Sequence, residues 1–229
     1  MENHSSSLSY HFPPEKIFIL GAGHFGYVAS KRLSRRYPKA SFVVIDSSQE
    51  RLSKIEKEIS LPVLQRDAIS FISSNPVSED QWIIPAIPVH VAFQWLMHKL
   101  RTEHETNQID VPQAADGKVP NPFRMNSKTL YASYATFVCP DVCNEPDELC
   151  TYTGKPRQGN LFDDLKKVKV PDFEIVVVRS WQLAPGVGGY PGSSLSTALD
   201  IISHNPGNYL VATSCRCHGV IDALRWIDS

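Results

Sequence analysis

The chain has no large excess of charge of either sign. It has 229 residues, and its 23 Lys and Arg against 24 Asp and Glu give a formal net charge of -1, with no local run of Lys and Arg. Nucleic acids and anionic membrane surfaces attract clustered positive charge, so neither is an expected partner. The hydrophobic fraction of 42% is close to that of ordinary globular proteins and predicts a sizeable buried core.

Long apolar runs are missing as well. The most apolar long window, Trp82 to Leu100, is interrupted by Pro85, Pro88 and several polar residues, so it is too broken to span a bilayer. The N-terminus has no basic start followed by an apolar run, so it does not read as a secretory signal. We therefore expect a cytoplasmic protein without membrane insertion, and a disordered arm over residues 1–15.

Cysteine is absent before Cys139. All five cysteines lie in two groups, which are Cys139/Cys143/Cys150 and Cys215/Cys217. In a chain without a secretory signal, five cysteines do not indicate a disulfide framework. Their grouping indicates a local site instead.

The first half alternates strand and helix patterns. Short runs rich in β-formers occupy residues 16–20, 41–46, 61–64 and 81–87. The intervening segments, and a last one at 89–105, place apolar residues at helical spacing. This alternation predicts an α/β fold with a doubly wound parallel sheet of the Rossmann type, covered by helices on both faces. We assign residues 16–107 to this domain.

The second half begins after a segment rich in Pro, Gly, Asn and charged residues, 108–128, which predicts a linker. The following pattern predicts strands at 129–138, 173–179 and 209–214, and helices at 195–204 and 220–227. We assign residues 129–229 to an α/β half that carries the cysteines and either stands alone or continues the same sheet.

A glycine motif lies where the first strand meets the first helix. Gly21, Gly23 and Gly26 form G-x-G-x-x-G, in which the first glycine permits a tight turn, the second lets the backbone approach a pyrophosphate and the third allows close helix–strand packing. The diphosphate would bind the N–H groups at the helix start. The residues between these glycines are further cofactor-binding candidates, namely Ala22, His24 and Phe25.

Asp46 follows Gly26 by twenty residues, at the end of the second strand. A carboxylate at this place accepts hydrogen bonds from the ribose hydroxyls and repels a 2′-phosphate, so NAD(H) is favoured over NADP(H). The alternative interpretation is a glycine turn in an α/β protein that binds no nucleotide.

These motifs resemble a known family. Residues 16–110, and most closely Ile17 to Ile72, are similar to the N-terminal Rossmann domain of Trk-type potassium-uptake regulators, the regulator of K+ conductance family. The similar segments read ILGAGHFG, VVIDSSQERL and VLQRDAISF. The resemblance implies that the glycine loop holds the diphosphate, that Asp46 binds ribose and that Asp67 and Ala68 lie against adenine.

The resemblance has limits. Arg66 stands where the family has glycine, and the second half is unlike the family's C-terminal ligand module. The resemblance therefore implies a nucleotide site, whereas it is weak support for a role in potassium transport.

The cysteines predict a second site. Cys139 and Cys215 each follow a strand, and parallel strands deliver their carboxyl ends to one edge of a sheet, so the two groups are expected to converge. Cysteine thiolates beside an imidazole are typical ligands of zinc or of an iron–sulfur cluster. The candidate metal ligands are Cys139, Cys143, Cys150, Cys215 and Cys217. A redox pair formed by Cys215 and Cys217, or ordinary structural cysteines, are the alternatives.

Two functional hypotheses remain open. The first is an NAD(H)-dependent oxidoreductase or redox sensor with a metal or cluster, in which His218 is the candidate catalytic residue and Arg157 and Arg179 could meet an anionic small-molecule substrate. The second is a non-catalytic regulatory subunit that binds NAD(H) or ATP and gates a partner, as the Trk-type regulators do. A homodimer is a further expectation under both.

Overall fold

The computed structural model describes residues 13–228, so the arm expected at 1–15 lies almost entirely outside the described residues. The elements of the first half are β1 (Lys16–Leu20), α1 (His24–Arg36), β2 (Ser41–Asp46), α2 (Gln49–Ile59), β3 (Val63–Gln65), α3 (Ala68–Ser74), β4 (Gln81–Pro85) and α4 (Val91–Leu100). Those of the second half are β5 (Glu105–Ile109), the 3-10 helix η1 (Gln113–Lys118), β6 (Phe123–Arg124), β7 (Thr129–Ser133), α5 (Leu161–Leu165), β8 (Phe173–Arg179), β9 (Trp181–Ala184), β10 (Val187–Pro191), α6 (Gly192–Ser203), β11 (Gly207–Ser214) and β12 (His218–Ile227).

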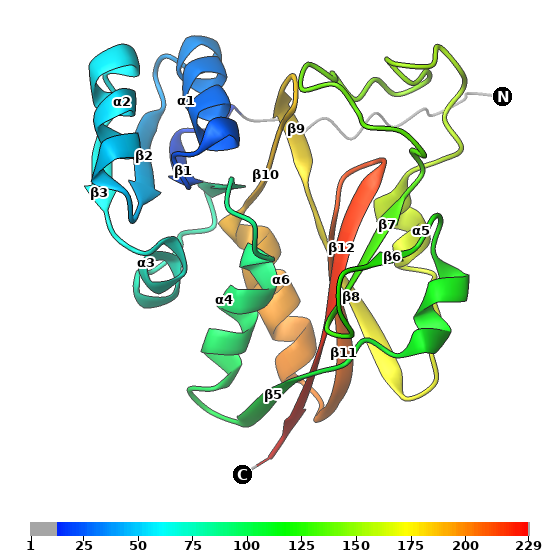
Figure 1. Ribbon diagram of the computed structural model, residues 1–229. Coiled ribbons are helices and arrows are strands. Elements are labelled where there is room, and N and C mark those ends of the chain that lie inside the picture. Colours follow the sequence, from blue (N-terminus) through cyan, green and yellow to red (C-terminus); the bar gives the residue numbers. More distant parts are fainter. Residues whose placement is uncertain (1–12, 229) are drawn as a thin grey trace, which may run out of the picture.

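The first sheet has the order β3-β2-β1-β4-β10-β9 (Figure 1). Strands β1 to β4 are mutually parallel, with β1 between β2 and β4. Strand β10 pairs antiparallel with β4, and β9 pairs antiparallel with β10. The predicted α/β class and parallel Rossmann-like core are therefore confirmed, and a hairpin from the second half extends the same sheet.

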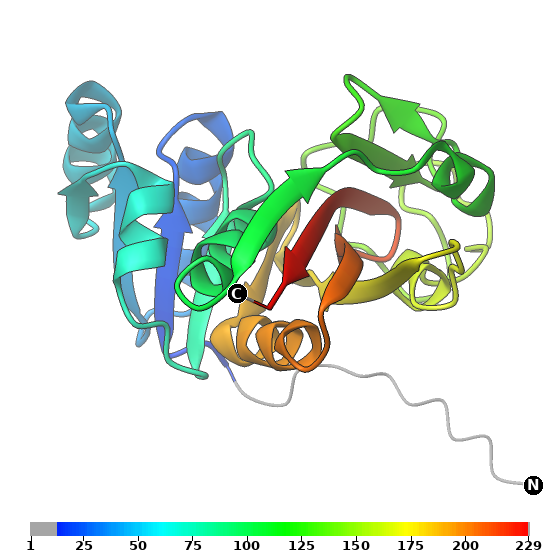
Figure 2. The same cartoon turned by 90° about the horizontal axis from the view of Figure 1, so that it is seen from below.

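The two faces of this sheet have different neighbours. Apolar residues of α1 and α2 pack on one face, together with Leu183 and Val187 of the β9–β10 hairpin. Helices α3, α4 and α6 cover the other face. Helices α4 and α6 also pack on the second sheet, so they lie between the two sheets (Figures 1 and 2). One hydrophobic core thus joins both halves of the chain.

The second sheet has the order β6-β7-β12-β11-β8, and β5 also pairs with β12. Only β8 and β11 are parallel, whereas the other pairs are antiparallel. Its central strand β12 is buried on both faces, because Leu224 and Trp226 face the α4–α6 layer while Ile221 and Ala223 face a third core formed with η1 and α5.

Two sequence predictions for this half were wrong. Residues 220–227 form most of strand β12 instead of a closing helix, and the sheet around it is largely antiparallel. A strand buried on both faces shows no alternation of polar and apolar residues, so its pattern is easily taken for a buried helix. The strand expected over 129–138 ends at Ser133.

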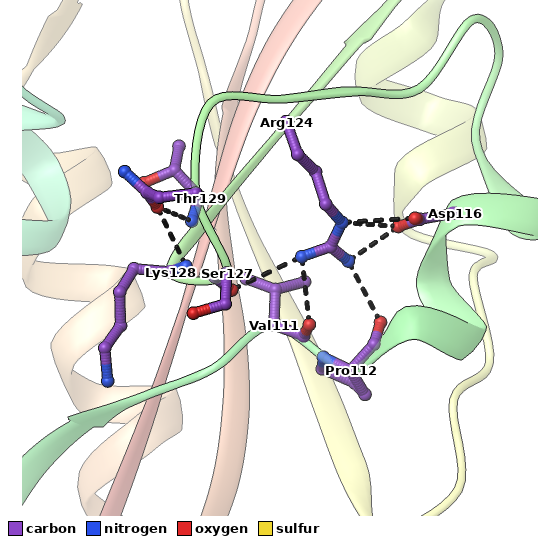
Figure 3. A network of polar contacts seen from close by, with 8 residues as sticks. Val111, Pro112, Asp116, Arg124, Ser127, Lys128 and Thr129 are labelled. Atoms are coloured by element: carbon purple, nitrogen blue, oxygen red, sulfur yellow. Dashed lines mark hydrogen bonds and ion pairs between the residues drawn. The ribbon is translucent and has the colours of Figure 1, made fainter.

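The segment expected to be a linker, 108–128, contains the end of β5, η1 and β6. Figure 3 shows how Arg124 holds it together. The Arg124 guanidinium donates to the Asp116 carboxylate at 2.6 and 2.9 Å and to the carbonyl oxygens of Val111, Pro112 and Ser127 at 3.0–3.3 Å. A planar guanidinium with five N–H groups can satisfy this many acceptors at once, so a segment poor in regular structure is nevertheless well fixed.

Within residues 13–228, no helix is both long enough and apolar enough to cross a lipid bilayer.

Candidate functional site: the glycine loop and the cysteine cleft

The glycine loop runs from Gly21 to Gly23, between the end of β1 and the start of α1. Gly21 has a φ of +111°, a conformation that favours glycine, and a Cβ there would lie 2.6 Å from the carbonyl oxygen of Ala86. A Cβ on Gly26 would lie 1.9 Å from the carbonyl oxygen of Gly21. The first and third glycines of the motif are therefore required by the close packing of α1 against the strand ends.

Gly23 is different, because no described heavy atom lies within 4 Å of the position that its Cβ would take. Gly23 is also the N-cap of α1, and no side chain of the described residues caps this helix start. The first N–H groups of a helix have no partner within the helix, and together with the helix dipole they attract anions. The open side of the loop thus has both the space and the donors that a diphosphate needs.

Asp46 lies at the end of β2 and is buried beside this loop. Its carboxylate accepts hydrogen bonds from the N–H of Ala22 and the N–H of Ser48, each at 2.7 Å. The exposed side chain of Arg51 approaches the same carboxylate at 3.8 Å. Each carboxylate oxygen can accept a further hydrogen bond, so Asp46 can orient the glycine loop and still receive ribose hydroxyls.

Asp67 and Ala68 lie at the start of α3. Asp67 is the N-cap of this helix, and its Oδ1 accepts a hydrogen bond of 2.8 Å from the N–H of Ser70. This bond to the backbone of Ser70 holds the pKa of the Asp67 carboxyl below its usual value. Ala68, the first residue of α3, is buried.

His24 and Phe25, the first residues of α1, face the second half of the chain. His24 Nε2 lies 3.1 Å from Oδ2 of Asp141, in the loop between Cys139 and Cys143. Phe25 is 62% exposed and lines a cleft of about 740 Å³. In the first half this cleft is lined by Phe25 of α1 and Pro85 at the end of β4, and it extends into the second half.

All five cysteines and His218 line the same cleft. The sheet topology explains their convergence. Strands β7 and β11 both pair antiparallel with β12, so they run in the same direction and the chain leaves them at one edge of the sheet. Cys215 directly follows β11, and Cys139 follows β7 by a short loop. The structure thus brings together the two cysteine groups that the sequence separates.

His218 links the two groups. Its Nε2 lies 3.5 Å from Sγ of Cys139, and its Nδ1 lies 3.8 Å from Sγ of Cys215. Desolvation in the cleft lowers the pKa of His218, which favours the neutral imidazole. A neutral imidazole has one donor and one acceptor nitrogen, so it can bridge two thiols.

Arg157 supplies positive charge to the cleft. Its Nη1 donates to Sγ of Cys217 at 2.5 Å, and its Nε donates to the carbonyl oxygen of Pro146. Arg179, the other arginine considered for an anionic substrate, does not line this cleft. It is stacked between the rings of Phe162 and Trp181, with its guanidinium carbon 4.1 and 3.4 Å from the two ring centres.

The thiols differ in their electrostatic surroundings. Desolvation raises the pKa of Cys139, Cys215 and Cys217. By contrast, a side-chain hydrogen bond with Thr153 and the backbone N–H groups that follow Cys150 lower the pKa of its thiol. Within residues 13–228, no group of three or more His, Cys, Asp or Glu side chains is placed so that it could hold a metal ion.

Two residues of the cleft were missed by the sequence reasoning. Glu145 lines the cleft, and its Oε1 accepts a hydrogen bond of 2.6 Å from the N–H of Arg216. Asp141 lies between Cys139 and Cys143, in the segment that we call the cysteine loop, and connects this loop to His24. Neither residue belongs to a recognisable motif, although both lie in the acid-rich loop between the first cysteines, which is the signal that could have indicated them.

Comparisons with known proteins give two family matches. The TrkA-N domain matches residues 17–73, which confirms the resemblance of the first half, and a family described as "Uncharacterized protein, C-terminal domain" matches residues 92–227. An "Uncharacterized protein" of Archaeoglobus fulgidus is 28% identical over 220 residues, which cover 90% of this chain and 98% of that protein. No solved structure matches the chain. Because the second family match spans more than half of the chain, the chain belongs to the family described as "Uncharacterized protein, C-terminal domain", and it carries a TrkA-N domain at its N-terminal end.

Proposed function

We propose that this chain is an NAD(H)-binding regulatory protein that performs no reaction on the nucleotide. The observation that carries the proposal is the open space at Gly23. There the start of α1 has room for a diphosphate, beside the buried carboxylate of Asp46. The match to the TrkA-N domain supports a nucleotide at this place. In this proposal the diphosphate binds the N–H groups of the glycine loop, and the ribose next to adenine binds Asp46.

The choice of nucleotide follows from the charge of Asp46. A buried carboxylate at the end of β2 accepts hydrogen bonds from a ribose diol, whereas it repels the 2′-phosphate of NADP(H). Arg51 is the nearest cation, but its side chain is 61% exposed and already approaches Asp46. The expected preference is therefore for NAD(H).

Calorimetric titration of the full chain with NADH, NADPH and ATP tests this proposal. Gly23→Val places a branched side chain where the diphosphate would bind, and a loss of at least about tenfold in NADH affinity is expected, equivalent to about 1.4 kcal/mol. Gly117→Val is the matched control, because a Cβ on Gly117 also meets no described atom within 4 Å but lies in the second half. If a folded Gly23→Val variant binds NADH like the wild type, the nucleotide does not bind at this loop.

A regulatory role is supported by the contacts between the nucleotide site and the second half. The residue after Gly23 is His24, whose imidazole contacts Asp141 in the cysteine loop. Arg32, on the same helix, donates to the carbonyl oxygens of Asp141 and Pro185. A nucleotide bound at the start of α1 would therefore contact a helix that is hydrogen-bonded to the cysteine loop. Binding that favours one position of this helix would also favour one conformation of the loop.

A redox enzyme or redox sensor is the second candidate. One observation favours it: Phe25, in the first turn of α1 directly after the glycine loop, lines the same cleft as the five cysteines and His218. A nicotinamide ring reaching past Phe25 would enter a cleft rich in thiols. Anaerobic mixing with NADH and an artificial electron acceptor separates the two candidates. A sustained loss of NADH absorbance in the wild type, abolished in His218→Asn, would indicate an enzyme. Tight NADH binding without turnover would indicate a regulator.

A further inference from the structure

A second pocket, of about 610 Å³, lies between the two halves of the chain. The first half contributes Arg36 at the end of α1 and Trp82 of β4, and the second half contributes residues 144–147 and strand β9. The pocket adjoins the cysteine cleft at Glu145 and Gln182, although none of the five cysteines lines it. A molecule bound in this pocket would therefore contact both halves of the chain.

Arg179, the last residue of β8, lines this pocket and lacks acceptors for its charge. The rings of Phe162 and Trp181 cover the two faces of its guanidinium. Its Nε is closed off from solvent without a hydrogen-bond partner, and no carboxylate within residues 13–228 forms an ion pair with it. Burying a cationic N–H without an acceptor costs free energy, so an anion bound beside this arginine would stabilise it.

The nearby acids are already used by other groups. Asp147 forms an ion pair with Arg216, and Glu145 accepts a hydrogen bond of 2.6 Å from the N–H of Arg216. Asp163 pairs with a lysine at the surface. Desolvation, followed by the like charge of Arg216, lowers the pKa of Arg179, and the three acids offset this only in part. The positive charge of Arg179 is therefore incompletely balanced within the described part of the chain.

The charge and the geometry of the site indicate the kind of molecule that fits. Three arginines line the pocket, Arg36, Arg179 and Arg216, against two acids, Glu145 and Asp147, so positive charge is in excess. Because rings cover both faces of the Arg179 guanidinium, a further hydrogen bond can form only at its edge, within its plane. A carboxylate is planar and accepts two parallel hydrogen bonds from such an edge. The site thus favours a carboxylate over a neutral group.

The pocket is larger than a carboxylate group alone requires. Leu183, Pro185 and the ring of Trp181 line it beside Arg179. Small-molecule sites commonly combine such apolar walls with a few polar groups that fix the orientation of the ligand. We propose that this pocket binds a small organic carboxylate, whose carboxylate group bonds to the edge of the Arg179 guanidinium and whose apolar body lies against Trp181 and Leu183.

This ligand would be a second one, in addition to the nucleotide of the proposed function. Arg36 lies in the last turn of α1, and the glycine loop precedes the first turn of the same helix. A carboxylate ligand and a nucleotide would therefore contact opposite ends of one helix, as an effector and a cofactor of a regulatory protein could. The inference does not depend on nucleotide binding, and NADH titration of the same samples tests the nucleotide proposal separately.

The tryptophans of the chain provide a direct readout. Of the four, Trp82 and Trp181 line the pocket, whereas Trp95 and Trp226 are buried in the core around α4 and α6. Benzoate added to the full chain should shift the indole N–H NMR signal of Trp181 in a saturable manner and leave the signals of Trp95 and Trp226 in place. Benzamide, a neutral molecule of nearly the same shape, should cause no saturable shift. A response to phenyl phosphate stronger than that to benzoate, or no saturable response to benzoate, would overturn the proposal.

Variants of Arg179 test its role as the anion-binding group. Arg179→Lys keeps the charge without the planar fork, and Arg179→Met removes both, so benzoate should bind at least about tenfold more weakly to each. Arg225→Met is the matched control, because Arg225 is exposed on β12 and does not line the pocket. Benzoate affinity that is unchanged in a folded Arg179→Met variant would overturn the proposal.

Stability separates a binding role from a structural one. Without benzoate, Arg179→Met should melt at or above the wild-type temperature, because it removes a cation that lacks acceptors. Arg124→Met should melt well below it, because the Arg124 guanidinium is fully bonded. Benzoate should raise the melting temperature of the wild type and of Arg225→Met but not that of Arg179→Met. If Arg179→Met is destabilised as strongly as Arg124→Met, the arginine serves the fold and the proposal is overturned.

Discussion

His90 and Asp222 form a buried pair that joins the two sheets. Nδ1 of His90 lies 2.7 Å from Oδ2 of Asp222, and their side chains are only 5% and 4% exposed. His90 precedes α4 of the first half, whereas Asp222 lies in the central strand β12 of the second sheet. The remaining polar atoms are also paired, because His90 Nε2 contacts Thr213, and Asp222 Oδ1 accepts from Gln108 and Thr129. This fully satisfied network fixes the second sheet against the start of α4.

Removing one partner of this network should therefore be costly. Asp222→Ala leaves the side chains of His90, Gln108 and Thr129 without their acceptor, and a loss of about 3–5 kcal/mol in the free energy of unfolding is expected. Urea denaturation followed by circular dichroism measures this loss. Asp80→Ala is the control, because Asp80 pairs with Lys16 at the surface, where solvent screens the pair, so this variant should lose far less stability. Similar costs for the two variants would show that the buried network does not hold the sheets together.

Such a pair could not have been predicted from the sequence, because its members are 132 positions apart. The parts that were predicted have local determinants. The strand at 16–20, the glycines after it and the acid at the end of the next strand identify the first half within about fifty residues, and the structure has them as expected. The second half depends on pairing between distant strands. Its central strand β12 is buried on both faces, so 220–227 carried no alternation that distinguishes a strand from a helix.

The candidate site also has one part that local sequence determines and another that depends on contacts between distant segments. The convergence of the cysteines was predictable from the position of Cys139 and Cys215 after strands, even though the sheet between those strands is antiparallel. By contrast, loop conformation determines the individual contacts around the cleft, such as those of Arg157 with Cys217 and of His24 with Asp141. No periodicity in the sequence specifies these contacts.

Gly26→Ala tests the packing of the glycine loop. A Cβ on Gly26 would lie 1.9 Å from the carbonyl oxygen of Gly21, and this neighbour is backbone, which cannot rotate away. The clash should outweigh the roughly 1 kcal/mol by which alanine favours a helix over glycine, so we expect a net loss of about 1–3 kcal/mol in the free energy of unfolding. Gly23→Ala is the control in the same loop, because its Cβ would meet no described atom within 4 Å. Thermal unfolding that ranks the two variants in the opposite order would contradict the geometry.

Asp67 should stabilise the protein in a pH-dependent manner. Its carboxylate caps α3 through the N–H of Ser70, and this bond lowers its pKa in the folded state. The stabilisation is therefore complete above the unfolded-state pKa of about 3.9 and is lost as the pH falls through the lower folded-state pKa. We expect Asp67→Ala to cost about 1 kcal/mol at neutral pH and progressively less in acid. Urea unfolding at several pH values measures the difference. Asp67→Asn keeps a capping oxygen. At neutral pH it should therefore lose less stability than Asp67→Ala does.

Arg32→Ala should loosen the cysteine loop from α1. Arg32 Nη1 donates to the carbonyl oxygen of Asp141 at 2.6 Å and also to that of Pro185, and together with His24 it ties the loop to the helix that follows the glycine loop. The lost hydrogen bond to the carbonyl oxygen of Asp141 is worth about 1 kcal/mol, so the loop should open roughly fivefold more often. The rate of alkylation of Cys139 and Cys143 by iodoacetamide, followed by mass spectrometry, reports this opening. Lys31→Ala is the control on the same helix, because the Lys31 side chain is exposed and makes no ion pair within the described residues.

The same variant tests whether nucleotide binding reaches the cleft. If the contacts of α1 carry the effect, saturating NADH should slow alkylation of these cysteines in the wild type and in Lys31→Ala, and should slow it much less in Arg32→Ala. A ligand changes a distant loop only when it favours one arrangement of an element to which the loop is bonded, and Arg32 and His24 each provide one bond from α1 to this loop. NADH binding of normal affinity in Arg32→Ala, with protection equal to that of the wild type, would show that the signal does not pass through this contact. Direct shielding of the thiols by the nicotinamide end of the nucleotide would then be the simpler explanation, because Phe25 and the cysteines share one cleft.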